Sequence, residues 1–294
     1  MRSGRYLVGL FSLSILVLAV TGCSGKTAAP PLGEIPHVTS VDQLSRPIDS
    51  WLPTMGQVNS IIKATGVVAA QCMRNYGFDY HLDEKEVDPI AEIDRGETFG
   101  YFNPSTVGEK GYDAVIIGTS TEVDAKPGES VVFSGRDNKG APVKEYAGKS
   151  LPEGGCYRFA QNAVGDVPKF SPQELPDGGP KIPLTDPRLT SVIKSWSECM
   201  KVAGFSYGTP AEAFLDPRWR TRESGYKHTS LEISVATADS NCKISSNLMG
   251  VVVALEAAYD LPYIKSHVSV LEALKRKCDS QASKASAIIA SSNA

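Results

Sequence analysis

Two ten-residue stretches repeat one pattern: "QCMRNYGFDY" at residues 71–80 and "ECMKVAGFSY" at residues 198–207. Both read Cys-Met, a basic residue, two variable positions, Gly-Phe, one variable position and Tyr. Five identities and one shared basic position in ten residues argue against a coincidence between two amphipathic helices. An ancient duplication is one explanation. The pattern predicts two loosely similar halves, each built around one copy of the motif.

Each copy has the features of a helix end. Apolar residues recur with helical spacing through residues 58–73 and 192–203, which predicts two amphipathic helices whose Cys and Met face the core. Gly77 and Gly204 then stop these helices, because glycine tolerates the left-handed conformation that ends a helix. The phenylalanine after each glycine is expected to fold back onto the last turn.

A second cysteine-containing helix follows each motif helix. The sequence "GGCYRFAQNAV" at residues 154–164 places Cys156 on one face with apolar residues. Residues 229–232 read Thr-Ser-Leu-Glu, a capping-box pattern that predicts the start of a helix carrying Cys242 on its apolar stripe. We expect the chain to be helical from there almost to its end.

Five cysteines lie beyond the N-terminal segment, so four of them can form two disulfides and one is left over. The two-half pattern predicts the bridges Cys72–Cys156 and Cys199–Cys242 and leaves Cys278 as a free thiol. In the chain-entropy account, loops of this size contribute about 4–4.5 kcal/mol each. That account barely separates the three pairings that these four cysteines allow. The choice therefore depends on the two-half pattern.

The N-terminus has the pattern of a bacterial lipoprotein signal peptide. Arg2 and Arg5 form a basic head, and residues 7–20 carry no charge. This apolar run is shorter than the roughly 20 residues of a membrane-spanning helix, and it fits the apolar region of a signal peptide. Small residues then precede Cys23, as in a lipobox. We predict a signal peptide at residues 1–22; a membrane anchor with a buried cysteine is the alternative.

The predicted signal peptide and lipobox indicate where in the cell the protein is located. Diacylglycerol on Cys23 would hold the chain at the extracytoplasmic face of the cell membrane, since two acyl chains bind a bilayer stably. Residues 23–45 begin with a Gly-, Ala- and Pro-rich run and are expected to form a flexible tether. The membrane is thus the predicted partner, together with an envelope protein or cell-wall component that the sequence does not identify.

Residues 46–285 are predicted to form a mainly α, disulfide-pinned ectodomain. Its halves lie at about 46–170 and 186–285, and a linker rich in Pro and Gly at residues 165–187 joins them.

Three smaller features complete the predicted architecture. β-forming residues on either side of a Pro-Gly turn predict a small β-hairpin within residues 112–134. Pro262 is expected to kink or split the last helical stretch. Residues 286–294 are small and weakly amphipathic, and we expect them to form a frayed tail.

Composition and motifs exclude several functional classes. The chain has 33 acidic and 30 basic side chains, so no positive field favours nucleic acid. No C-x-x-C pair or metal-ligand spacing of histidines occurs, and we expect no metal and no cofactor. The G-x-S-x-G, H-E-x-x-H, P-loop and G-x-G-x-x-G motifs are absent. S-x-x-K occurs without the K-T-G companion that its chemistry needs, so we expect a protein that is not an enzyme.

One stretch carries a candidate surface contact. "DPRWRTRES" at residues 216–224 places Trp219 among Arg218, Arg220 and Arg222. Arginines around an aromatic ring suit anionic lipid or cell-wall phosphate near a membrane. The alternative is a capped loop in which the Trp anchors the segment to the core.

The lipobox, the two C-M-(R/K)-x-x-G-F helix ends, the G-C-Y helix and the D-x-x-C helix together resemble a group of lipid-anchored secreted proteins of actinobacteria. The resemblance covers about residues 55–275 and implies a mostly helical, disulfide-pinned ectodomain without implying an activity. Cys278 departs from the pattern of the group.

The function expected from these observations is that of a lipid-anchored extracytoplasmic protein, which binds a partner or supports the envelope without catalysis. Two alternatives remain open. One is the solute-binding component of a transporter, which normally has two α/β lobes. The other is an envelope hydrolase whose site is assembled from scattered residues.

Overall fold

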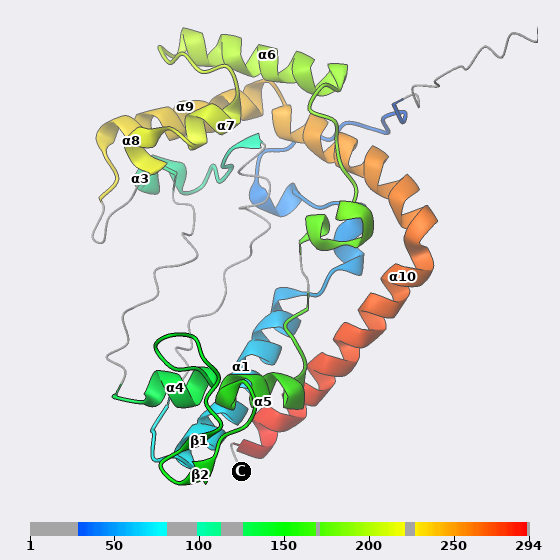
Figure 1. Ribbon diagram of the computed structural model, residues 1–294. Helices are drawn as coiled ribbons and strands as arrows, with labels where there is room; N and C mark the ends of the chain where they lie inside the picture. The colour runs from blue at the N-terminus through cyan, green and yellow to red at the C-terminus, as the bar shows by residue number, and fades with distance from the viewer. Residues whose placement is uncertain (1–28, 81–98, 113–125, 169–170, 221–226, 293–294) are drawn as a thin grey trace, which may run out of the picture.

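The computed structural model describes residues 29–80, 99–112, 126–168, 171–220 and 227–292 (Figure 1). Within these ranges the chain is mainly helical, with one two-stranded antiparallel sheet and two disulfides, which confirms the predicted fold class. The elements are η1 (Val41–Gln43), η2 (Pro47–Trp51), α1 (Met55–Arg74), α3 (Val107–Lys110), α4 (Glu129–Ser134), β1 (Glu145–Tyr146), β2 (Lys149–Ser150), α5 (Gly155–Val164), η3 (Pro172–Glu174), η4 (Pro176–Gly178), α6 (Pro187–Val202), α7 (Pro210–Phe214), α8 (Pro217–Arg220), α9 (Ser230–Ser245) and α10 (Leu248–Ser292).

The two motifs end α1 and α6 in the same way. Gly77 and Gly204 both adopt the left-handed conformation, with φ of 85° and 90°. The amide of the following phenylalanine donates to the carbonyl of the motif methionine, at 3.2 Å after α1 and 2.9 Å after α6. These bonds satisfy carbonyls that the end of a helix leaves free. The predicted helix ends are therefore confirmed in both copies.

Each motif cysteine is bonded to a cysteine on a later helix of its half. Cys72 of α1 is joined to Cys156 of α5, and Cys199 of α6 is joined to Cys242 of α9. Cys278 on α10 is free and buried. The structure thus contains the two predicted pairings and the predicted free thiol.

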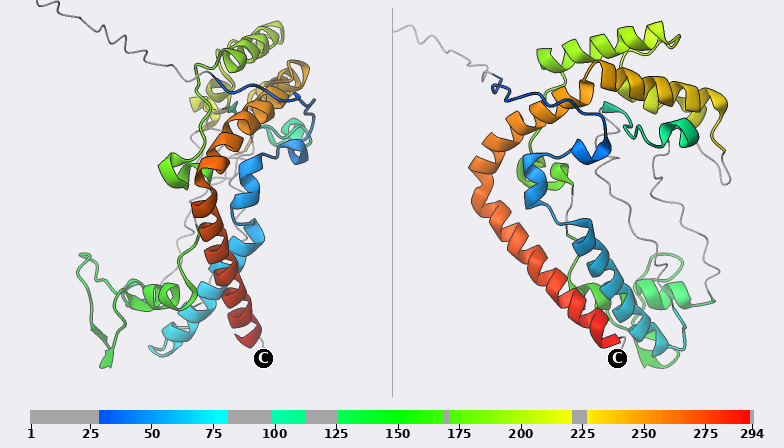
Figure 2. Two further views of the ribbon diagram at one scale, coloured as in Figure 1. Left: turned by 90° about the vertical axis from the view of Figure 1, so that its right-hand side faces the viewer. Right: turned by 180° about the vertical axis from the view of Figure 1, so that it is seen from behind.

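The helices form two lobes along α10 (Figures 1 and 2). The upper lobe contains α3, α6, α7, α8, α9 and the start of α10, and the lower lobe contains α1, α4, α5 and the hairpin beside the end of α10. The two lobes do not coincide with the two predicted halves of the sequence, because each lobe includes a segment from the other half. Residues 99–112 of the first half pack in the upper core, and the end of α10 packs against α1 in the lower core.

α10 is a 45-residue helix that continues through Pro262, so the predicted split there is absent. The helix curves along its length (Figure 1). It reaches Ser292, and the prediction of a frayed tail from residue 286 is wrong for the described part. Ile288 and Ile289 explain this difference, because both pack against the lower core.

Part of the predicted tether at residues 23–45 is packed against the body. Val38 is only 1% exposed and belongs to the upper core. Asn247, between α9 and α10, accepts a bond from the Val38 amide (3.2 Å) and donates to the Pro36 carbonyl (2.9 Å). A Cβ at Gly250 would lie 2.0 Å from that carbonyl, so glycine permits this close approach. The segment 23–45 is therefore not a free tether throughout.

The small hairpin lies elsewhere than predicted. β1 and β2 pair at Glu145–Ser150, whereas the expected return strand at residues 131–133 lies in α4. Residues 113–125, which would hold the other predicted strand, are outside the described residues. Val132 is fully buried beside the Cys72–Cys156 bridge, so packing overrides the β-propensity of this segment.

A buried polar network attaches residues 99–112 to α9. Lys243 Nζ donates to the Tyr101 carbonyl (2.6 Å) and to Asp239 Oδ2 (2.8 Å). Asp239 also accepts bonds from Trp196 Nε1 (2.9 Å) and the Tyr112 hydroxyl (3.2 Å). The side chains of Lys243 and Asp239 are fully buried, so each ion depends on the other for compensation.

Replacing Lys243 by Met is expected to lower the free energy of unfolding by about 3–5 kcal/mol, because Asp239 loses the ammonium that compensates its buried charge. Urea denaturation measures the change. Lys194→Met on the exposed face of α6 is the matched control and should change stability by less than about 0.5 kcal/mol. Equal effects of the two substitutions would contradict the role given to the network.

Candidate functional site: a cavity beside α10

A cavity of about 460 Å³ lies where three distant parts of the chain meet. They are residues 51–57 at the entry to α1, residues 166–168 and 174–176 of the linker, and residues 270–281 of α10. The volume falls in the range of about 300–1,000 Å³ that small-molecule sites occupy. The apolar walls come mainly from Trp51, Leu52, Leu175, Pro176, Val270 and Leu274.

One stripe of α10 forms a wall of the cavity. Val270, Leu274 and Cys278 follow one another at spacings of four residues, which places them on one helix face. Val270 and Leu274 are 46% and 39% exposed, so the stripe is incompletely covered by the protein itself. Leu271 beside it is fully buried against Ile48, which fixes this part of α10.

The linker crosses α10 and is held at the upper end of the cavity. The Tyr263 hydroxyl donates to the Pro176 carbonyl (2.7 Å), and His267 Nε2 lies 3.1 Å from Asp177 Oδ2. The His267 ring also stacks on Tyr263, with ring centroids 4.1 Å apart. The linker is therefore attached to α10 at this end by a hydrogen bond and an ion pair, and the stacking on Tyr263 positions the His267 ring.

The lower end of the linker is held by Gln281 of α10. Its Nε2 donates to the Asp166 carbonyl at 3.2 Å. Gly165 has φ of 117°, and a Cβ there would lie 2.1 Å from Gln281 Nε2. The positive φ therefore favours glycine at this position, and the absence of a Cβ lets Gln281 approach closely.

Two of the polar side chains at the rim of the cavity, Gln57 and Lys275, have hydrogen-bond partners in the protein. Gln57 Nε2 donates to Asp279 Oδ1 (2.8 Å), and Lys275 Nζ donates to the Ser50 carbonyl (3.3 Å). The rim carries charges of both signs, and the apolar residues lie between them. The cavity is therefore apolar inside, and the charges at its rim do not produce a strong electrostatic field of one sign.

Cys278 lies in the wall of this cavity. Burial raises the pKa of its thiol, and the neighbouring Asp279 adds to the shift. The thiol is therefore protonated at neutral pH, unlike a reactive thiolate. Counting cysteines predicted a free thiol here, but its place in a cavity depends on contacts that the count does not report.

The prediction of a surface contact at residues 216–224 is wrong for Trp219, because this residue is buried. This residue is 1% exposed, its Nε1 donates to the Ala213 carbonyl (3.0 Å), and its ring stacks on Tyr112. The alternative of an anchoring Trp is confirmed. Arg218 is half-exposed and paired with Asp216 at 2.7 Å.

Several predictions concern residues whose structure is not described. Cys23 and the signal peptide at residues 1–22 lie outside the described residues, as do Arg222 and the side chain of Arg220.

The described ranges contain no group of three or more His, Cys, Asp or Glu side chains placed to hold a metal ion. No single helix in them combines the length and apolarity of a membrane span, although α9 and α10 meet both criteria as a pair bent by 62°.

The chain matches no family model, no curated protein and no solved structure.

We expect His267 to titrate above its ordinary pKa of 6.5. The Tyr263 carbonyl and then the Asp177 carboxylate both favour the protonated ring. The stability that His267 contributes is complete below its unfolded-state pKa and is lost as pH rises through the higher folded-state pKa. NMR titration of the ring measures this value.

Asp177→Asn should lower the pKa of His267 without abolishing the shift, because the carbonyl of Tyr263 remains. A pKa at or below 6.5 in the unsubstituted protein would contradict the described contacts.

Proposed function

We propose that this protein is a lipid-anchored extracytoplasmic binding protein, attached to the membrane through a thioether at Cys23. The observation that supports it most is the pair of disulfides, each joining a motif helix to a later helix of the same half. Disulfides of this kind form and persist in oxidising compartments outside the cytoplasm. This agrees with the signal-peptide pattern that precedes Cys23.

The anchor would hold the upper lobe close to the bilayer. Arg188 at the start of α6 donates to the Pro30 carbonyl at 2.6 Å, so the body is contacted seven residues after Cys23. A fully extended chain covers at most about 3.6 Å per residue, so Cys23 can lie at most about 25 Å from Pro30. The attachment therefore restricts both the height and the orientation of the protein at the membrane.

The body is best suited to binding. The residues that line the cavity include one thiol, Cys278, and no histidine that could activate it. The described fold also argues against the solute-binding alternative. Those proteins use two α/β lobes, whereas the strands here are two residues long.

Cys23→Ser tests the anchor in cells that make the protein. After feeding an alkyne fatty acid, the unsubstituted chain should carry the label and stay with the membrane in high salt, because two acyl chains hold it. The Cys23→Ser chain should carry none, since serine offers no sulfur for the thioether.

Cys278→Ser is the matched control, because it also removes a thiol that is outside a disulfide. It should keep the label and the membrane association. Equal labelling of the Cys23→Ser and Cys278→Ser chains, or an unlabelled natural sequence, would overturn the proposal.

A further inference from the structure

We infer that the cavity beside α10 is a binding site for a small uncharged molecule with an apolar body. This inference rests on the proposed binding function and names the ligand class of its site. The space of about 460 Å³ suits one small molecule rather than a protein segment. A stable protein–protein interface needs about 1,000 Å² or more, far beyond this concave patch.

The walls select an apolar ligand. Trp51 and Leu52 from the entry to α1 face the linker residue Leu175 and the α10 stripe with Val270 and Leu274. The two stripe residues keep large exposed fractions although they belong to a concave site. An apolar ligand would remove this surface from water, which is the main favourable contribution to such binding.

The rim disfavours an ionic ligand. Three carboxylates and two ammonium groups border the cavity, from Asp166, Glu174, Asp279, Lys275 and Lys277. These charges nearly balance, so they do not attract ions of one sign. Placing an ion against the apolar walls would cost desolvation without a dedicated partner. A neutral ligand with a small polar end fits both features.

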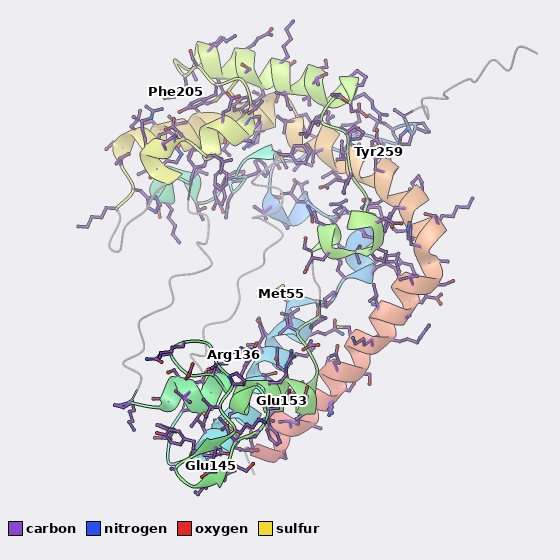
Figure 3. All side chains as sticks on the ribbon, in the orientation of Figure 1. Met55, Arg136, Glu145, Glu153, Phe205 and Tyr259 are labelled. Atoms are coloured by element: carbon purple, nitrogen blue, oxygen red, sulfur yellow. A yellow bond between two sulfur atoms is a disulfide. The ribbon has the colours of Figure 1, made fainter. Side chains whose placement is uncertain are left out.

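The ligand would lie between the two lobes, against the middle of α10. The cavity lies at the waist, where η2 and the linker pack on α10 around Leu271. Figure 3 marks Met55 at the start of α1 and Tyr259 on α10, on the two helices that border this region. Tyr259 donates to Asp186, the N-cap of α6, at 3.0 Å. The site therefore belongs to the part of the molecule that connects the lobes.

N-phenyl-1-naphthylamine, a neutral dye that fluoresces in apolar surroundings, is the probe for the first test. The protein is the mature chain, residues 23–294 with Cys23→Ser, which contains every described residue. Titration should saturate at one dye per chain, whereas the related anionic dye 8-anilinonaphthalene-1-sulfonate should bind at least tenfold more weakly. Tighter binding of the anionic dye, or no saturation with the neutral one, would overturn the proposal.

Leu274→Glu places a charge in the cavity wall and should weaken binding of the neutral dye at least tenfold. Leu261→Glu is the matched control, because Leu261 is 59% exposed on the same helix and outside the lining. It should leave the affinity unchanged. Equal affinities of the two folded variants would place the dye elsewhere and contradict the inference.

Cys278 provides a second readout that needs no substitution in the wall. Saturating neutral dye should slow the reaction of Cys278 with N-ethylmaleimide at least fivefold, and an unchanged rate would contradict the assignment. Neither dye measurement depends on the lipid. Failure here with intact labelling at Cys23 rejects the cavity alone, whereas loss of labelling rejects the anchor alone.

Discussion

In each half of the chain, a disulfide links the end of the motif helix to another helix, and the rest of the structure depends on these two links. In each half a cysteine five residues before the glycine that ends the motif helix is bonded to a later helix of that half. The bridges close loops with sequence separations of 84 and 43 residues, which corresponds to about 4–4.6 kcal/mol each in the chain-entropy account. Each bridge also contributes a buried cysteine to the apolar core of its lobe. Cross-linking and burial therefore stabilise the same helix pairs.

α10 connects these two cross-linked helix pairs, because it packs in the cores of both lobes. Its first turns pack in the upper core and its last turns pack in the lower core, so neither lobe contains only its own half of the sequence. Near the middle, Arg46 holds Asp260 (2.5 Å) and Glu256 (3.7 Å), two residues whose carboxylates are almost fully buried. Asp260 also accepts a bond from the Ile48 amide at 3.1 Å. These contacts immediately precede Pro262, where a helix loses a hydrogen bond, and they hold η2 against α10 beside the cavity.

The sequence predicted best what is determined locally. The glycine stops and the helix starts follow from spacing and end chemistry, the pairing of the cysteines follows from the two-half pattern, and the structure contains all of them. Tertiary contacts decided the features that were predicted wrongly. Val132 is helical because it packs beside a disulfide, Ile288 extends α10 because it meets α1, and Trp219 turns inward to a carbonyl and an aromatic ring. The cavity was not predicted, because its three walls come from segments more than 90 residues apart.

Peptide mapping of the native protein under non-reducing conditions tests the central claim most directly. The protein is taken from the cells that make it, and free thiols are alkylated during denaturation, before digestion and mass spectrometry. The account predicts peptides joined through Cys72–Cys156 and Cys199–Cys242, with an alkyl group on Cys278. A bridge between Cys72 and Cys199, or full alkylation of all four of the paired cysteines, would contradict it.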